Sequence, residues 1–196
     1  MRVLVLTTDL STGGAEMALF RVLNTLTAQG IEPLVVSMMG IHGKHFPTMG
    51  LPIYSLEMPR AMLTWRGIMK LRAIVREFKP DIIQGWMYHA NVLASLSVTG
   101  LKNKPDIFWG IHHSLASPKD ESASTKIALA LSRVLAPQPA GIIYCAHSAL
   151  EQHRNFGLNN ANSQVIANGV FTDKLQPNFK VNSPAVIGFA GRYHAA

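Results

Sequence analysis

The sequence predicts an α/β protein built on a doubly wound parallel sheet, and three observations lead to that prediction. Short β-branched runs alternate with longer segments of helical periodicity along the 196 residues. The strand-like runs are apolar almost throughout, which is typical of strands buried on both faces. Gly30, Gly100 and Gly157 each follow a helical segment, where helices often end in a left-handed residue. These patterns favour a Rossmann-like domain with helices on both faces of the sheet.

The expected elements follow one another regularly along the chain. Strands are predicted for the short apolar runs at residues 3–7, 33–37, 51–56, 81–85, 106–111, 141–145 and 164–167. Helices are predicted between them, at about residues 15–28, 60–78, 91–99 and 124–135, and from residue 148 onward. The second helix should end near Phe78 because Pro80 follows. Ser148 and Glu151 match a capping box, which predicts that the last helix starts there.

The chain is predicted to contain one complete domain and the beginning of another. Residues 1–170 hold the alternating elements, and residues 171–184 are polar and punctuated by turn formers, as expected of a linker. Residues 185–196 start with a new strand, AVIGFA, that is followed by no helix. A lone strand cannot bury both faces of a parallel sheet, so we expect this last segment to open a truncated second domain.

Composition excludes a membrane-spanning or disulfide-stabilised protein. The chain is 48% hydrophobic, but its apolar runs are broken well before the ~20 residues that a membrane span needs. Met1 and Arg2 lead straight into a strand rather than a signal peptide. Cys145 is the only cysteine, so no internal disulfide can form. These features predict a cytoplasmic protein.

The net charge of +7 favours an anionic partner. The densest basic stretch, from Arg60 to Arg76, interleaves its cations with apolar residues at helical spacing. Two interpretations remain open. The favoured one is a solvated outer face on a helix that packs on the sheet, and the other is peripheral contact with an anionic membrane. Charge alone does not choose between them.

The Gly13 and Gly14 pair lies between the first strand and the first helix. Ligands of parallel sheets bind at the carboxyl ends of strands, and two glycines permit positive φ and a close approach to the backbone. The alternative is a tight turn without a ligand. The segment lacks G-x-G-x-x-G, so a dinucleotide cofactor is not expected. Glu16 would partly cancel the attraction of the helix for a phosphate, which favours a hydroxyl-rich ligand.

Four motifs occur in order along the chain: TDLSTGGAEMAL, IHHS, VIANGV and VIGFAGR. Their order and spacing resemble family 4 of the retaining glycosyltransferases over essentially the whole chain. The resemblance implies the two-domain GT-B fold and a hexosyltransferase that moves a sugar from a nucleotide-sugar to an acceptor. It further implies that this chain is the amino-terminal, acceptor-side domain and is inactive by itself.

The resemblance also implies roles for individual residues. Gly13 and Gly14 match the family's glycine-rich loop near the donor phosphates, and Glu16 matches an acidic residue to which we assign loop ordering. His112, or its neighbour His113, matches a histidine near the donor sugar, and we expect one of the two to serve in catalysis.

Other predicted site residues lie further along the chain. Arg192 matches a basic residue that holds the donor diphosphate, although the lysine that follows it in the family is absent here, as is the E-x7-E motif of the second domain. Trp86, Tyr88 and His89 follow a strand and could bind the acceptor, the two aromatic rings by stacking on a sugar. The same aromatic residues could equally serve in packing.

The resemblance implies that the leaving phosphate helps to deprotonate the acceptor, so we nominate no carboxylate of this domain as a base. We expect a nucleotide-sugar as co-substrate, no metal or other cofactor, and a saccharide or lipid-linked acceptor of cell-surface polysaccharide or lipopolysaccharide synthesis. The site of action would be the cytoplasm or the inner face of the cell membrane. The alternatives are a nucleic-acid-binding domain, which would need aromatics interleaved with cations on one surface, and a non-catalytic carbohydrate-binding domain.

Overall fold

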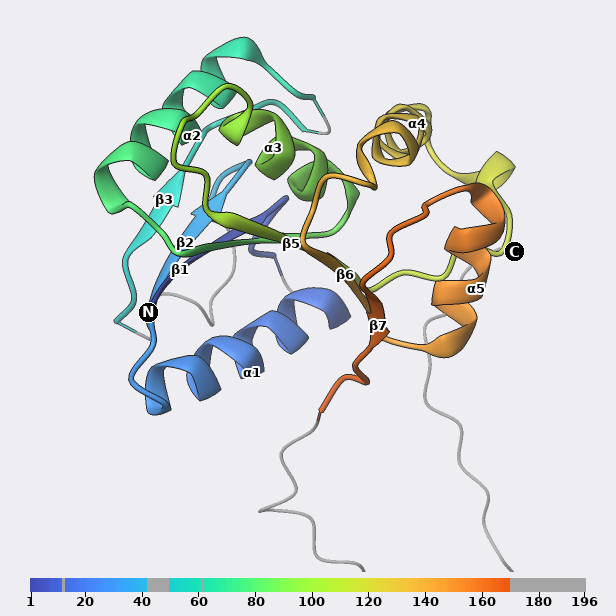
Figure 1. The fold of residues 1–196 in the computed structure, drawn as a ribbon, viewed down its shortest axis with the longest axis horizontal. Coiled ribbons are helices and arrows are strands. Elements are labelled where there is room, and N and C mark those ends of the chain that lie inside the picture. The colour runs from blue at the N-terminus through green and yellow to red at the C-terminus, as the bar shows by residue number, and fades with distance from the viewer. Residues whose placement is uncertain (12, 42–49, 61, 170–196) are drawn as a thin grey trace, which may run out of the picture.

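A parallel sheet of seven strands forms the centre of the structure, a computed structural model that describes residues 1–169 except residues 12, 42–49 and 61 (Figure 1). The strand order is β3-β2-β1-β4-β5-β6-β7, and every neighbouring pair is parallel. The strands are β1 Arg2–Thr7, β2 Glu32–Ser37, β3 Ile53–Ser55, β4 Ile82–Trp86, β5 Asp106–Ile111, β6 Gly141–Tyr144 and β7 Ser163–Val165. The predicted doubly wound α/β fold is confirmed.

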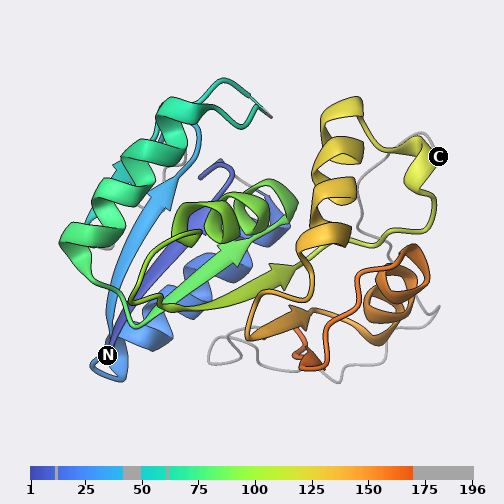
Figure 2. The same cartoon turned by 45° about the horizontal axis from the view of Figure 1, so that its top comes forward.

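Helices cover the two faces of the sheet unequally. They are α1 Gly14–Ala28, α2 Trp65–Phe78, α3 Tyr88–Val98, α4 Ala123–Leu135 and α5 His147–Phe156. Helix α1 lies on one face, whereas α2, α3 and α4 form a layer on the other (Figures 1 and 2). The larger apolar core lies between the sheet and the four helices α2, α3, α4 and α5. A smaller one lies between α1 and strands β1 and β2. Helix α3 is buried almost all round, as a helix between two neighbours and a sheet must be.

The helix starts correct three expectations from the sequence. Helix α2 begins at Trp65, not at residue 60, because Thr64 caps it and accepts a hydrogen bond from the Gly67 amide. Helix α3 already begins at Tyr88, directly after β4. The capping box at Ser148 is wrong, since α5 starts at His147 and Ala146 is its N-cap.

The helix ends agree better with the sequence. Gly30, Gly100 and Gly157 have φ angles of 72°, 77° and 105°, so each takes the left-handed conformation predicted for it. Helix α2 ends at Phe78, as predicted from the proline beyond it. The predicted linker at 171–184, the second domain at 185–196 and Arg192 lie outside the described residues.

The chain reverses its winding direction between β1 and β4, which are neighbours in the sheet. The connection after β1 leads to α1 on one face, and the connection after β4 leads to α3 on the other. Such a switch point leaves a crevice at the carboxyl ends of the two strands, where ligands of open α/β sheets bind. The Gly13 loop and His112 both lie at this edge of the sheet, as predicted.

No helix within the described part of the chain is long and apolar enough to cross a bilayer.

Candidate functional site

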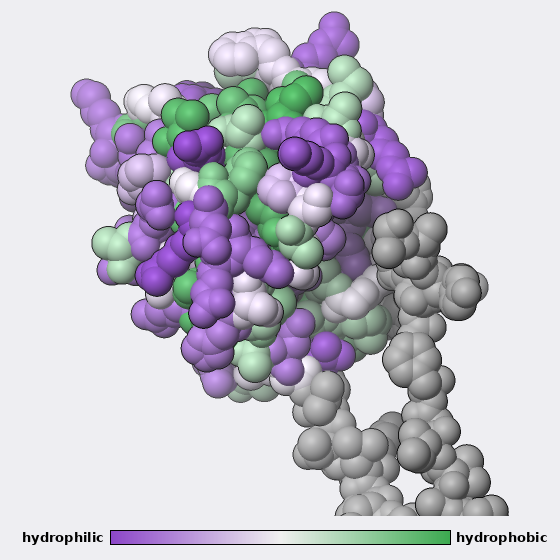
Figure 3. Space-filling model, turned by 90° about the vertical axis from the view of Figure 1, so that its right-hand side faces the viewer, coloured by the Kyte–Doolittle hydropathy of each residue, from purple (hydrophilic) through white to green (hydrophobic). Residues whose placement is uncertain are grey.

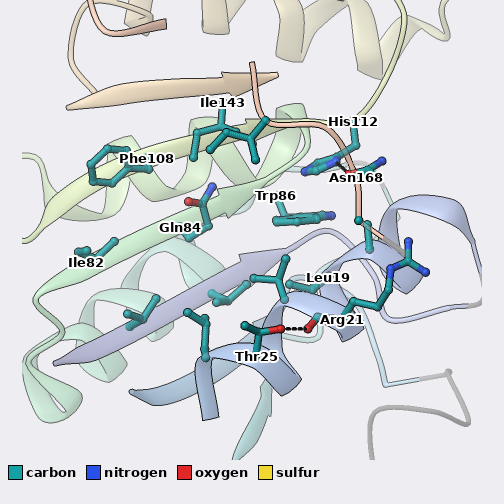
Figure 4. Close-up of a pocket in the computed structure, with 18 of the residues that line it drawn as sticks. Leu19, Arg21, Thr25, Ile82, Gln84, Trp86, Phe108, His112, Ile143 and Asn168 are labelled. Carbon is teal, nitrogen blue, oxygen red and sulfur yellow. Dashed lines mark hydrogen bonds between the residues drawn. The ribbon is translucent and has the colours of Figure 1, made fainter. Parts of the chain in front are cut away.

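A pocket of about 650 Å³ opens between α1 and the sheet, next to the switch point (Figure 4). Apolar side chains from α1, β1, β4, β5 and β6 form most of its wall, among them Val3, Leu19, Ile82, Phe108 and Ile143. Its polar side chains are Arg21, Thr25, Gln84, His112 and Asn168. A mostly apolar hollow with a few converging polar groups is typical of a ligand site.

Trp86, His112 and Asn168 meet at the carboxyl edge of this pocket. The Trp86 and His112 rings stack with their centroids 3.9 Å apart and an interplanar angle of 20°. The Trp86 indole N–H donates to the Ala15 carbonyl at 3.0 Å, which ties β4 to the first turn of α1. Nδ1 of His112 lies 3.2 Å from Oδ1 of Asn168. Segments far apart in the sequence are thus joined at one point.

The His112 imidazole is neutral at physiological pH. Burial lowers its pKa to about 4, against a smaller opposing effect of the hydrogen bond to Asn168. Because the amide oxygen of Asn168 only accepts, the ring proton sits on Nδ1, and Nε2 keeps a lone pair. A hydroxyl near Nε2 would therefore donate a hydrogen bond to it.

The adjacent His113 faces a different part of the molecule. Its Nε2 lies 2.7 Å from Oε1 of Glu121, beside the short turn at Pro118–Asp120, and the ring is exposed. Of the two predicted histidines, the structure brings only His112 to the pocket. The geometry therefore favours His112 over His113 as the histidine near the donor sugar. A catalytic role for either residue stays a prediction.

The backbone of the glycine pair differs from the left-handed conformation that two glycines permit, and its role beside the donor phosphates stays a prediction. Neither Gly13 nor Gly14 has positive φ, and Gly13 is the extended N-cap of α1 with φ −151°. A Cβ on Gly13 would collide with the Glu16 carboxylate, which folds back over it. Within the described part of the chain nothing lies within 4 Å of a Cβ placed on Gly14. Neither glycine uses the positive φ that it permits, and a side chain at position 13 would require the Glu16 carboxylate to move.

Tyr88 and His89 lie in the first turn of α3, away from the pocket. Tyr88 is 3% exposed and its hydroxyl lies 2.6 Å from Nε2 of His153. His89 is half-buried and contacts the backbone of Ser124 at the start of α4, and burial lowers its pKa. Of the three predicted acceptor residues only Trp86 lines the pocket, and an acceptor role stays a prediction for all three.

Met87 holds strained backbone between β4 and α3. Its φ of 74° and ψ of 166° belong to a region that side chains other than glycine rarely occupy, at a cost of about 1 to 3 kcal/mol. Hydrogen bonds hold it there, because its N–H donates to Gly110 and its carbonyl accepts from the Asn91 amide. Strain of this kind gathers where backbone is held for function, and here it lies at the switch point.

Two of these residues were not identified from the sequence. Asn168 lies within the VIANGV motif, which was the available signal, but only its contact with His112 shows where the side chain goes. Nothing in the sequence around Met87 signals its conformation. The described residues contain no group of His, Cys, Asp and Glu that could hold a metal ion, and a metal-free reaction stays a prediction.

The model of glycosyltransferase family 4 matches residues 12–174, most of the chain. The chain belongs to this family. A search of curated protein sequences found no match.

Solved structures agree with the family 4 assignment at the level of fold. Anabaena HepE, solved in complex with UDP, superimposes with a TM-score of 0.69 at 18% identity over 87% of this chain and 44% of its own. The lipopolysaccharide outer core galactosyltransferase WaaB, in its apo form, gives 0.67 at 14% identity over 93% and 50%. Sucrose-phosphate synthase from Thermosynechococcus elongatus gives 0.67 at 11% identity over 94% and 52%.

The chain thus has a Rossmann-like α/β fold that matches part of these GT-B glycosyltransferases. It spans about half the length of each of these three proteins.

Proposed function

We propose that this chain is the acceptor-side domain of a hexosyltransferase that moves a sugar from a nucleotide-sugar to a saccharide or lipid-linked acceptor. The observation that carries the proposal is the junction of Trp86, His112 and Asn168 at the switch point of a family 4 chain. Support for the donor class comes from HepE, solved with UDP-glucose. The partner domain would bind the nucleotide, with Arg192 at the diphosphate.

His112 would orient the sugar rather than transfer a proton through a charged ring. Its neutral Nε2 can accept a hydrogen bond from a sugar hydroxyl, while Asn168 fixes the tautomer and Trp86 fixes the plane of the ring. A group held in place before the reaction lowers the barrier because it pays no reorganisation cost in the transition state. No metal is required for this role.

The first turn of α1 would lie near the donor phosphates. Its free amides point toward the carboxyl edge of the sheet and favour negative charge, but the Glu16 carboxylate over Gly13 offsets part of that attraction. Glu16 would therefore order the loop, and the negative charge of the diphosphate would be neutralised mainly by the partner domain.

The acceptor is proposed to be a lipid-linked or lipopolysaccharide sugar at the inner face of the cell membrane, within cell-surface polysaccharide synthesis. Support comes from the basic helix α2 and from WaaB, whose name places it in the lipopolysaccharide outer core. The protein would then act in the cytoplasm and contact the membrane peripherally.

The test is calorimetry of the whole protein with UDP-glucose, UDP-galactose and UDP, followed by release of UDP with a panel of saccharide and lipid-linked acceptors. Binding of a nucleotide-sugar and acceptor-dependent release of UDP are the expected results. Lack of binding for every nucleotide-sugar, by protein whose circular dichroism shows it folded, would reject the proposal. The fragment of residues 1–196 should neither bind the donor tightly nor transfer sugar.

A further inference from the structure

Asn91 is a fully buried polar residue in the first turn of α3. Its Nδ2 donates to the Gly110 carbonyl at 3.2 Å, whereas its Oδ1 has no hydrogen-bond partner among the described residues. A buried acceptor without a partner destabilises a fold. An apolar side chain would avoid this cost, so packing alone does not account for an asparagine at this position.

Asn91 donates hydrogen bonds to both segments that lead into the candidate site. Its backbone N–H donates to the Met87 carbonyl at 2.9 Å, and its side chain donates to the Gly110 carbonyl. Met87 directly follows Trp86 in the chain, and the peptide of Gly110 lies two residues before His112. The two rings that stack at the pocket edge are thus carried by segments that one residue joins (Figure 4).

Two glycines provide the room that this arrangement needs. A Cβ on Gly85 would collide with Oδ1 and the backbone of Asn91. A Cβ on Gly110 would lie 3.3 Å from Nε2 of His112, which is closer than side chains normally pack. The imidazole ring therefore lies over the backbone of Gly110, so a shift of that peptide also shifts the ring.

The turn at Met87 needs to be held because its backbone is strained. Its φ of 74° and ψ of 166° belong to a region that is essentially restricted to glycine. The turn leads from β4 into the first turn of α3, and the side chain of Asn91 ties that first turn to Gly110 of β5. Without this bond the Met87 turn could relax, and Trp86 would move with it.

We propose that Asn91 is a positioning residue that holds the stacked rings of Trp86 and His112 in place through the backbone of β4 and β5. Its effect on turnover rests on the proposed function, because that effect depends on the role of His112. Its effect on the arrangement of the two rings does not.

Asn91 does not act by contact with a ligand. The side of the molecule that carries α5 has hydrophilic side chains interspersed with apolar ones (Figure 3). Asn91 is 0% exposed, so it contributes nothing to that surface or to any other. Its influence on a ligand must pass through the residues that it holds.

Ser95 provides a matched control from the same helix. It lies one turn after Asn91, is 1% exposed, and accepts a hydrogen bond from the Trp109 indole N–H at 3.2 Å. Asn91 and Ser95 thus each join α3 to β5 by one buried hydrogen bond. The bond of Ser95 goes to a side chain that does not line the pocket. Ser95→Ala should therefore lower stability without moving the ring of His112.

Nuclear magnetic resonance of the whole protein, with labelled histidine rings, measures the arrangement directly. The signals of His112 are those that His112→Gln lacks. In the wild type we expect its Cε1 proton to be shifted upfield by the Trp86 ring, and its pKa to be about 4. In Asn91→Ala the upfield shift should shrink and the pKa should rise by about one pH unit, because a loosened ring is less desolvated.

Turnover provides the second readout. Asn91→Ala should lower kcat about 10- to 100-fold and leave KM for the nucleotide-sugar within about threefold, because a group that acts in the transition state is misplaced. In a His112→Ala background the same substitution should cause less than about threefold further loss, since the ring that it positions is gone. Ser95→Ala should keep the kcat and the His112 signals of the wild type.

A Met87→Gly background guards the test against misfolding. Glycine takes this backbone conformation without strain, so Asn91→Ala should fold there even if it does not fold alone. The His112 signals should move in the same direction as in the native background, but less.

The proposal is overturned by unchanged His112 signals in both backgrounds, by an equal change in Ser95→Ala, or by independent kcat losses for Asn91→Ala and His112→Ala. The resonance comparison is made without substrate. A protein in which Asn91→Ala moves the His112 signals, but which transfers no sugar, would therefore reject the proposed function alone.

Discussion

His112 and His153 show how differently two buried histidines can be used within one sheet. Both are kept neutral because burial lowers their pKa values, to about 4 for His112. Each donates from Nδ1 a hydrogen bond that fixes its tautomer, His112 to Oδ1 of Asn168 and His153 to the Ala149 carbonyl within α5. A lowered pKa is therefore common to the two regions and does not by itself mark a site.

His112 and His153 differ in whether Nε2 of the ring has a hydrogen-bond partner. Nδ1 of His153 lies 2.6 Å from the Ala149 carbonyl and donates to it, so Nε2 accepts from the Tyr88 hydroxyl, and the ring is fully buried. Nε2 of His112 has no hydrogen-bond partner among the described residues, and its ring borders the pocket. Both ring nitrogens of His153 are hydrogen-bonded inside the protein, whereas Nε2 of His112 is available to bind a ligand.

The largest expected effect is on turnover at His112. His112→Ala in the whole protein should lower kcat about 30- to 1000-fold, or roughly 2 to 4 kcal/mol, because a positioned polar group is removed from the site. Its free energy of unfolding should fall by only about 1 kcal/mol, because the partly buried ring loses its stacking on Trp86. Steady-state release of UDP and urea unfolding measure the two quantities.

His113→Ala is the matched control for this prediction. His113 is the adjacent residue, but it faces Glu121 and lies outside the pocket. Its kcat should stay within about twofold of wild type. If His113→Ala loses more turnover than His112→Ala, the assignment of the two histidines is reversed.

The next effect is on stability at His153. His153→Ala should lower the free energy of unfolding by about 2 to 4 kcal/mol, because it leaves a cavity and strands the buried Tyr88 hydroxyl. Tyr88→Phe should cost about 1 to 3 kcal/mol, and the two losses should not add. His147→Ala, at an exposed position of the same helix, should stay within about 0.5 kcal/mol. Additive losses at Tyr88 and His153 would contradict the pairing.

The sequence predicted the sheet well because its signals are local. Each apolar run of β1, β2 and β5 is buried along nearly its whole length, so composition alone marks the strand. Helix starts were harder, since Ser148 looks like a cap in sequence while the chain actually turns into α5 at Ala146. The first residue of a helix depends on where the preceding strand ends in the sheet, and the local sequence pattern does not specify that position.

The site was predicted only in part because its contacts are distant in sequence. Trp86 and His112 could be placed at strand ends, but their stacking depends on the register between β4 and β5. The bond from His112 to Asn168 joins residues 56 positions apart. The burial of Tyr88 against α5, which removes its ring from the pocket, is likewise a tertiary effect.

A smaller effect is expected at the loop that begins α1. Gly13→Ala should cost about 1 kcal/mol, because alanine is a poor N-cap and its methyl group displaces the Glu16 carboxylate. In a Glu16→Ala background the cost should shrink, since the colliding group is gone. Gly14→Ala should stay within about 0.5 kcal/mol in unfolding. Equal costs at both glycines would contradict the role assigned to Glu16.

The smallest effect is the share of His112 in the pH dependence of stability. Its pKa is lowered to about 4 in the folded chain and is near 6.5 when unfolded, so the unfolded chain binds more protons between these values. The contribution of His112 to stability is therefore nearly complete above about pH 7 and falls as the pH falls, by roughly 0.5 to 1 kcal/mol between pH 7 and pH 6. His89 and His153 act in the same direction. His112→Gln should lose less stability than wild type over this interval, by an amount that thermal unfolding detects as about 2 °C. An identical slope for the two proteins would show that the His112 ring takes up its proton while the chain is folded, and the distinction between an open and a closed histidine would then have to rest on turnover alone.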